Sequence, residues 1–169
     1  MTTQPLNRLF ELLFVQLPKG LNLMVDKPVP GSRSRAFSEL LNLSMPASPE
    51  SVAAITDAIS KILVELEIPE SKRFEIDLAV QEALANAVVH GCNGDPSKSI
   101  RCRLNKDEAG HIVITVTDPG PGFTPETLKD PHQPENLYGD HGRGVYLIRQ
   151  LMDEVQFDRG GSEIKMWKY

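Results

Sequence analysis

Residues 79–91 read AVQEALANAVVHG, and they belong to a longer run in which apolar residues recur at helical spacing. The spacing predicts a helix from about Ser71 to His90, which Gly91 and Gly94 end. Its core-facing stripe consists of Ile76, Val80, Ala83, Leu84, Ala87 and Val88.

The same helix carries a polar stripe that core packing does not explain. Glu82, Asn86 and His90 lie at i, i+4 and i+8, which places successive members about 40° apart around the helix. A carboxylate can accept a proton or orient a water, and an asparagine oxygen is a neutral ligand for a hard cation. A partly solvated helix face would show the same residues, and His90 also suits a helix C-terminus. The stripe by itself leaves both interpretations open.

The segment from Asp26 to Arg35 contains prolines, a glycine and serines, and its apolar residues show no periodic spacing. These features predict a linker there. We therefore divide the chain into an N-terminal arm or extension, residues 1–35, and one domain, residues 36–169. Residues 1–35 are compatible with three interpretations: an arm that docks on the domain, a dimer contact, or extra residues from a start site placed too far upstream.

Within the domain, period-2 runs predict strands and period-3.6 runs predict helices. Ser48, Pro49 and Glu50 supply a helix N-cap, a proline at the first helical position and an acidic first turn. The predicted elements are a strand at Phe37–Met45, helices at Ser48–Glu67 and Ser71–His90, strands at Ser99–Leu104 and His111–Thr117, a long loop at Asp118–Gly142, a helix at Gly144–Met152, and strands at Glu154–Phe157 and Ser162–Trp167. This order is typical of an α+β fold, a two-layer sandwich with a mixed sheet and helices on one face.

A second polar cluster, Asp118 to Gly122, directly follows a predicted strand and has the pattern D-x-G-x-G. The proline after Asp118 favours extended backbone, and the glycines permit close approach of a ligand to the chain. An ionised aspartate there can accept a hydrogen bond from an amine, worth roughly 1.5–3 kcal/mol. A plain β-turn would use the same residue types.

The third cluster, Gly139 to Gly144, runs directly into a predicted helix. A glycine-rich loop at a helix start presents unpaired N–H groups to an anion, and Arg143 can add a bidentate phosphate contact. The sequence matches neither the P-loop nor the Rossmann pattern. A surface loop without a ligand is the alternative.

Taken together, the order and spacing of the three clusters resemble the GHKL (Bergerat) ATP-binding fold. The N box corresponds to Glu82–Asn86, the first glycine box to Asp118–Gly122, and the second to Gly142–Gly144. Residues around these boxes resemble the bacterial anti-sigma factor serine/threonine kinases of the sporulation and general-stress type. They are 79–83, 86–88 and 90–91 around the N box, and 142–145, 147–149 and 151–155 around the second glycine box. The resemblance covers about residues 38–169.

The resemblance implies roles for individual residues at the phosphate end of a nucleotide. Glu82 would be the general base toward the attacking hydroxyl, and Asn86 would hold Mg²⁺ against the phosphates of ATP. The glycine loop Gly142–Gly144 would wrap those phosphates, with His90 and Arg143 as further candidate contacts.

At the base end, the resemblance implies that Asp118 receives the adenine amino group. Gly120 and Gly122 would let the chain pass close to the nucleotide, and the Ser162 hydroxyl would lie near the adenine.

The activity implied is ATP-dependent phosphorylation of a Ser or Thr on an anti-anti-sigma (STAS) protein, combined with sequestration of a sigma factor by partner switching. A homodimer is expected from the family. Two alternatives are a nucleotide-dependent binding module without catalysis and a stand-alone histidine-kinase-type catalytic domain. The second normally follows a helix pair that bears the phosphoacceptor histidine, and only residues 1–35 precede this domain.

Composition agrees with a protein partner rather than nucleic acid. With 18 basic and 23 acidic residues, the net charge is −5, and no basic run offers a phosphate-backbone surface. The apolar run Leu12–Leu17 is too short to span a membrane, and no cleavage site suggests secretion. Cys92 and Cys102 form no metal-binding spacing, so we expect reduced thiols and a cytoplasmic protein.

Overall fold

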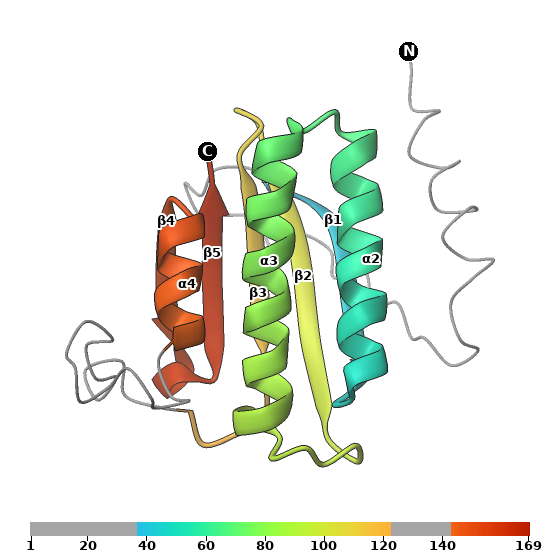
Figure 1. Ribbon diagram of the computed structural model, residues 1–169, viewed down its shortest axis with the longest axis vertical. Coiled ribbons are helices and arrows are strands. Elements are labelled where there is room, and N and C mark those ends of the chain that lie inside the picture. The colour runs from blue at the N-terminus through green and yellow to red at the C-terminus, as the bar shows by residue number, and fades with distance from the viewer. Residues whose placement is uncertain (1–36, 123–142) are drawn as a thin grey trace, which may run out of the picture.

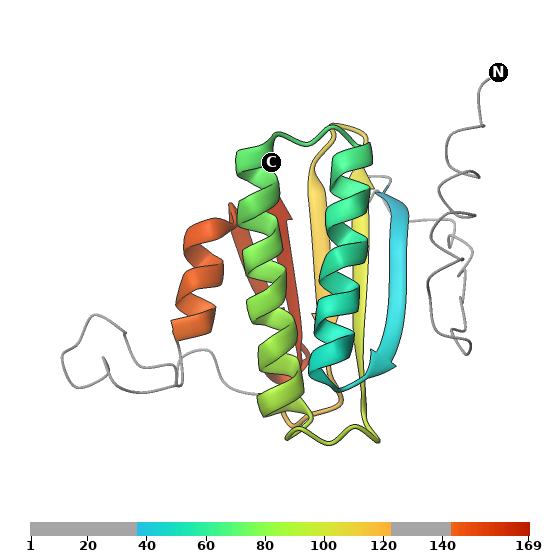
Figure 2. The same ribbon diagram turned by 45° about the vertical axis from the view of Figure 1, so that its right-hand side comes forward.

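The computed structural model of the protein describes residues 37–122 and 143–169. Helices cover one face of a five-stranded sheet, so the predicted α+β fold with two layers is confirmed (Figures 1 and 2). None of the helices in these ranges is long and apolar enough to cross a membrane. The elements are β1 (Phe37–Pro46), α2 (Pro49–Glu65), α3 (Glu70–Asn86), the π turn η1 (Ala87–Gly91), β2 (Ser99–Asp107), β3 (Ile112–Thr117), α4 (Arg143–Leu151), β4 (Glu154–Asp158), the 3₁₀ turn η4 (Arg159–Gly161) and β5 (Glu163–Lys168).

The sheet has the strand order β1-β2-β3-β5-β4, and each of these four pairings is antiparallel. The prediction of a mixed sheet was therefore wrong. Two helices, α2 and α3, separate β1 from β2, and such a helix hairpin returns the chain in the opposite direction. The β2–β3 and β4–β5 connections are short, and short connections join antiparallel neighbours.

Helix α2 begins as its sequence predicts. The Ser48 hydroxyl accepts a hydrogen bond from the Ser51 N–H at 3.3 Å, and Pro49 occupies the first turn, where its missing N–H has no partner to lose. A Ser48 cap of this kind typically contributes about 1 kcal/mol. It fixes the point at which the chain turns from β1 back over the sheet.

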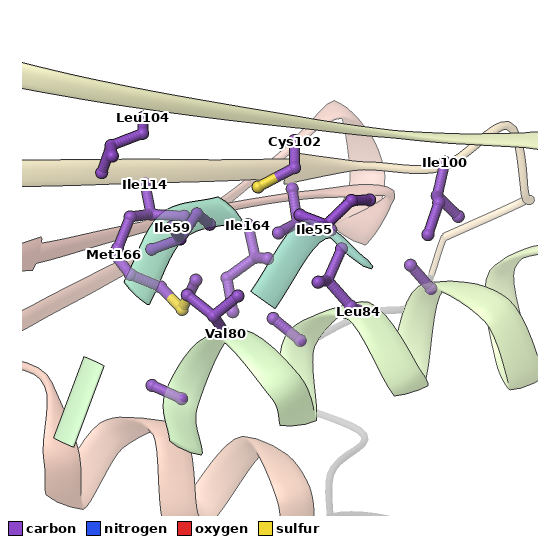
Figure 3. Packing of buried hydrophobic residues seen from close by; sticks show 14 of the residues in the cluster. Ile55, Ile59, Val80, Leu84, Ile100, Cys102, Leu104, Ile114, Ile164 and Met166 are labelled. Atoms are coloured by element: carbon purple, nitrogen blue, oxygen red, sulfur yellow. The ribbon is translucent and has the colours of Figure 1, made fainter. Parts of the chain in front are cut away.

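The hydrophobic core lies between the sheet and the helices (Figure 3). Alternate residues of β2, namely Ile100, Cys102 and Leu104, are fully buried, as period-2 patterning predicts. Burial of an aliphatic side chain such as Ile100 or Leu104 contributes roughly 1.5–3 kcal/mol. Both cysteines are buried free thiols, and burial raises the pKa of Cys102 to about 12. The core also contains, from helices and other strands, Ile55, Ile59, Val80, Leu84, Ile114, Ile164 and Met166.

A cluster of charged groups closes the end of the molecule where β5 finishes (Figure 1). The Lys168 Nζ donates to the Leu151 carbonyl at 2.8 Å and contacts Glu75 at 2.7 Å and Asp153 at 3.3 Å. The Tyr169 N–H donates to the other oxygen of Asp153 at 2.7 Å. We call these residues the C-terminal clasp, because they join β5 to α3 and to the end of α4.

We expect Lys168→Met to lower the free energy of unfolding by about 1–3 kcal/mol, since it removes the ammonium donor from the Leu151 carbonyl, from Glu75 and from one oxygen of Asp153. The Lys168 side chain is only 10% exposed. Urea denaturation measures the change. Lys61→Met is the matched control, because Lys61 pairs with Asp57 on the open surface of α2, and its loss should stay within about 0.5 kcal/mol. Equal losses in the two variants would contradict the clasp.

Candidate functional site

Helices α3 and α4 bring the N-box residues against the second glycine box. A Cβ atom placed on Gly144 would lie 2.9 Å from Glu82 Oε2 and 3.0 Å from Asn86 Nδ2. Glu82 and Asn86 are both half-buried. The absence of a side chain at Gly144 therefore leaves a small space that a carboxylate and an amide both face.

The C-terminal end of the N-box helix is not regular. Ala87 to Gly91 form a π turn, in which the Cys92 N–H donates to the Ala87 carbonyl at 2.8 Å. A π turn contains more residues than an α turn, so the 3.6-residue spacing that placed His90 in line with Glu82 and Asn86 does not extend past Asn86. His90 is exposed, and Gly91 is buried.

Asp118 lies just beyond β3, beside the start of β5. The pairing of Thr117 with Glu163 brings the Asp118 N–H to the Ser162 carbonyl at 3.0 Å. Its Oδ1 accepts from the Gly120 N–H at 2.7 Å. Burial raises the pKa of Asp118, although the Gly120 N–H and the nearby Lys98 oppose this effect. One carboxylate oxygen is thus engaged by the first glycine box itself.

Three glycines of this region lie against other backbone or against Asp118. A Cβ on Gly120 would lie 2.4 Å from the Gly91 carbonyl oxygen, and a Cβ on Gly91 would lie 2.2 Å from Asp118 Cγ. Gly122 has a φ of +73°, and its Cβ would lie 2.0 Å from the Gly160 carbonyl oxygen. Close packing accounts for all three, and for Gly122 a positive φ adds a second reason.

The remaining predicted residues are placed as follows. The Ser162 residue is buried beside Asp118, and its hydroxyl donates to the Arg159 carbonyl at 3.1 Å. Arg143 is exposed at the first position of α4. Gly142 and most of the long loop lie outside the described residues. The roles of these residues toward a nucleotide stay predictions, as do those of Glu82, Asn86, His90, Asp118 and the glycines at 120, 122 and 144.

Gly91 and Gly160 are not among the residues to which the sequence assigns a role toward a nucleotide. The sequence predicts Gly91 as a helix stop. Gly91 lies five positions after Asn86, the last residue of the N box, and this nearness is the signal that could have found it. Its contact with Asp118 joins residues from two separate elements.

A groove of about 520 Å³ lies between α2 and α3. It is lined by Val52 and Thr56 from α2, by Ala85 from α3 and by Val89 from the π turn η1, and it contains none of the predicted site residues. The groove is thus separate from the space at Gly144, which Glu82 and Asn86 face.

The side-chain oxygens that lie near Gly144, and those of Asp118, suit Mg²⁺ and a purine nucleotide. Glu82 and Asn86 offer carboxylate and amide oxygens, which are hard ligands of the kind Mg²⁺ prefers. The second oxygen of Asp118 can accept from an amino group, and the glycines leave backbone within reach of a ligand. The residues present therefore fit both groups.

Comparison with known families defines the class of this fold. Residues 45–168 match the family described as the histidine kinase-like ATPase domain. The match covers most of the chain and includes every helix and strand described above except the first part of β1. The chain belongs to this family.

Within the family, the chain is similar to proteins named serine-protein kinase RsbW. The protein of Oceanobacillus iheyensis is 30% identical over 138 residues, covering 78% of this chain and 87% of the relative. That of Listeria innocua is 30% identical over 137 residues, with 76% and 86% covered. That of Bacillus subtilis is 27% identical over 139 residues, with 78% and 86% covered.

Proposed function

We propose that this chain is an ATP-dependent serine/threonine protein kinase and anti-sigma factor. Its substrate would be a STAS-domain anti-anti-sigma protein, and its other partner would be a sigma factor. The observation that carries the proposal is the convergence of Glu82 and Asn86 on the space left by Gly144. Membership of the ATPase family and similarity to proteins named serine-protein kinase support it.

The chemistry proposed for Glu82 is proton removal. As the substrate hydroxyl oxygen bonds to the γ-phosphorus, the bond from that phosphorus to the bridging oxygen of ADP breaks, and the hydroxyl proton passes to Glu82. Asn86 is the residue that would hold Mg²⁺, which neutralises charge on the phosphates when bound. Because Glu82 and Asn86 lie one helical turn apart on α3, one rigid element sets the distance between base and metal ligand.

At the other end of the nucleotide, Asp118 would accept a hydrogen bond from the adenine amino group. Gly120 and Gly122 would pass close to the ligand, and Ser162 supports Asp118 through its carbonyl. The phosphates would lie near Gly142 to Gly144, where the start of α4 offers N–H groups and the exposed Arg143 offers a guanidinium.

We expect Asp118→Ala to weaken ATP binding by about 10- to 150-fold, because a hydrogen bond to a charged group contributes roughly 1.5–3 kcal/mol. Asp118→Asn keeps the size of the side chain and an acceptor for the Gly120 N–H, so we expect a smaller loss of about tenfold. Calorimetry with Mg-ATP measures both. An Ala variant that binds ATP like the unaltered chain would exclude Asp118 from adenine recognition.

The proposed hydrogen bond from the adenine amino group to Asp118 predicts that ATP affinity depends on pH. Burial raises the pKa of Asp118, so this carboxylate takes up a proton at a higher pH than a free aspartate does. ATP affinity should therefore fall as pH decreases through the raised pKa, whereas the Asn variant has no proton to gain there and provides the baseline.

For the partners we propose mutually exclusive binding of the STAS protein and the sigma factor on one surface, and a homodimer in the cytoplasm. The acidic net charge of −5 agrees with contact to protein rather than to nucleic acid.

Two measurements test the function. Calorimetry of the full chain with Mg-ATP should show binding, and the chain with [γ-³²P]ATP should label a STAS-domain protein of the same organism. Absence of ATP binding would overturn the nucleotide site. Binding without transfer to that STAS protein would instead favour the binding module without catalysis, and label on a histidine of another chain would favour a histidine-kinase type of domain.

A further inference from the structure

The geometry points to Gly91 as the position that sets the preference for adenine, acting through Asp118. Gly91 is a positioning residue, since it would shape the acceptor without touching the reacting phosphate. The inference rests on the proposed ATP site.

The first observation is the identity of the atoms that face Gly91. A Cβ there would lie 2.2 Å from Cγ, 2.3 Å from Oδ1 and 2.6 Å from Oδ2 of Asp118, and these are its three nearest neighbours. The carboxylate thus lies flat against the bare Cα of Gly91. Any side chain at this position must displace the acceptor proposed for the adenine amino group.

The second observation is that backbone conformation does not require glycine here. Gly91 is not among the residues with positive φ, whereas the nearby Gly94 has a φ of +66°. In a helix, alanine is favoured over glycine. Space for the Asp118 carboxylate is therefore the reason that the structure offers for glycine at the end of this helix.

The third observation is that the carboxylate has little freedom to move away. The Asp118 N–H is bonded to the Ser162 carbonyl, and Oδ1 accepts from the Gly120 N–H at 2.7 Å. Gly120 in turn lies against the Gly91 backbone, where its own Cβ would be 2.7 Å from the Gly91 Cα. Relief of a clash at Gly91 must therefore rotate the Asp118 side chain and break its bond to Gly120.

Nucleotide selectivity provides the test, because inosine triphosphate replaces the adenine amino group by an oxygen that cannot donate. The unaltered chain should bind Mg-ATP about 10- to 150-fold more tightly than Mg-ITP, which reflects one charge-assisted hydrogen bond. We expect Gly91→Ala to lower that ratio to below about threefold by weakening ATP binding, with ITP binding unchanged within about twofold.

The double variant Gly91→Ala/Asp118→Ala completes a double-mutant cycle. If Gly91 acts through the Asp118 carboxylate, the double variant should bind ATP like Asp118→Ala alone, because the clash has been removed together with the acceptor. Gly110→Ala is the control for a glycine replacement far from Asp118, since Gly110 lies in the β2–β3 turn at the clasp end. Because Gly110 has a φ of +90°, this variant adds backbone strain without touching Asp118, and its preference for ATP over ITP should be unchanged.

The outcomes separate the hypotheses. Unchanged ATP preference in Gly91→Ala, or equal loss of ATP and ITP, would overturn the inference in favour of a structural role alone. Should Gly91→Ala fail to fold, a folded double variant would support the clash with Asp118, and an unfolded one would overturn it. An unaltered chain that binds neither nucleotide would refute the proposed function rather than the role of Gly91.

Discussion

Replacing Glu82 by glutamine is expected to slow phosphate transfer to the STAS protein by roughly 10²- to 10⁴-fold, which is the usual contribution of a general base. ATP binding should change by less than about threefold, because glutamine has the same size and keeps its place against Gly144. Glu82→Ala should also retain ATP binding and lose transfer. The large effect on rate and the small effect on binding follow from a group that is needed only when the hydroxyl loses its proton.

Single-turnover transfer from [γ-³²P]ATP, together with calorimetry on the same preparations, measures the two quantities. Gln81→Ala is the matched control, because Gln81 precedes Glu82 on α3 but lines the groove toward α2. Unchanged transfer in Glu82→Gln would remove Glu82 from the mechanism. Loss of ATP binding in that variant would assign Glu82 to nucleotide binding instead.

Gly122→Ala is expected to lower the free energy of unfolding by about 2–5 kcal/mol. Part of the loss, roughly 1–2 kcal/mol, comes from forcing a residue with a side chain to adopt a φ of +73°. The larger part comes from contact with backbone, since the Cβ would lie 2.0 Å from the Gly160 carbonyl oxygen and 3.0 Å from the Ser162 nitrogen. Neither atom belongs to a flexible side chain that could move aside.

Gly160→Ala separates the two contributions, because Gly160 has a similar φ of +66° but nothing within 4 Å of its Cβ position. That variant should lose only the roughly 1–2 kcal/mol of backbone strain. Urea denaturation of both proteins gives the comparison. Equal destabilisation would show that the contact between the first glycine box and the turn before β5 contributes nothing beyond backbone strain.

The parts of the fold predicted correctly from sequence are those set by local patterns. The Ser48 cap, the apolar face of α2 and the alternation of Ile100 with Cys102 each depend on neighbours within a few residues, so one sequence is enough to reveal them. The convergence of Glu82 and Asn86 with Gly144 could be expected only through the resemblance of the three boxes to a known fold, since the residues come from two helices.

The features that sequence could not supply depend on contacts between distant elements. Nothing local distinguishes the π turn after Asn86 from a continued α-helix, and so the position of His90 was not predictable by counting turns. The antiparallel sheet depends on how α2 and α3 reverse the chain. The placement of Asp118 against Gly91 joins the end of a helix to the end of a strand, and neither pattern contains that information.

The two ends of the molecule are held by different chemistry, and this should give them different responses to salt. The C-terminal clasp depends on charges whose acidic partners, Glu75 and Asp153, are more than one third exposed, so mobile ions can screen it. The end that contains Asp118 is held by close packing of Gly91, Gly120 and Gly122, which ions do not weaken. In concentrated salt, amide hydrogen exchange should therefore accelerate around the clasp first, while the amides beside Asp118 keep their protection.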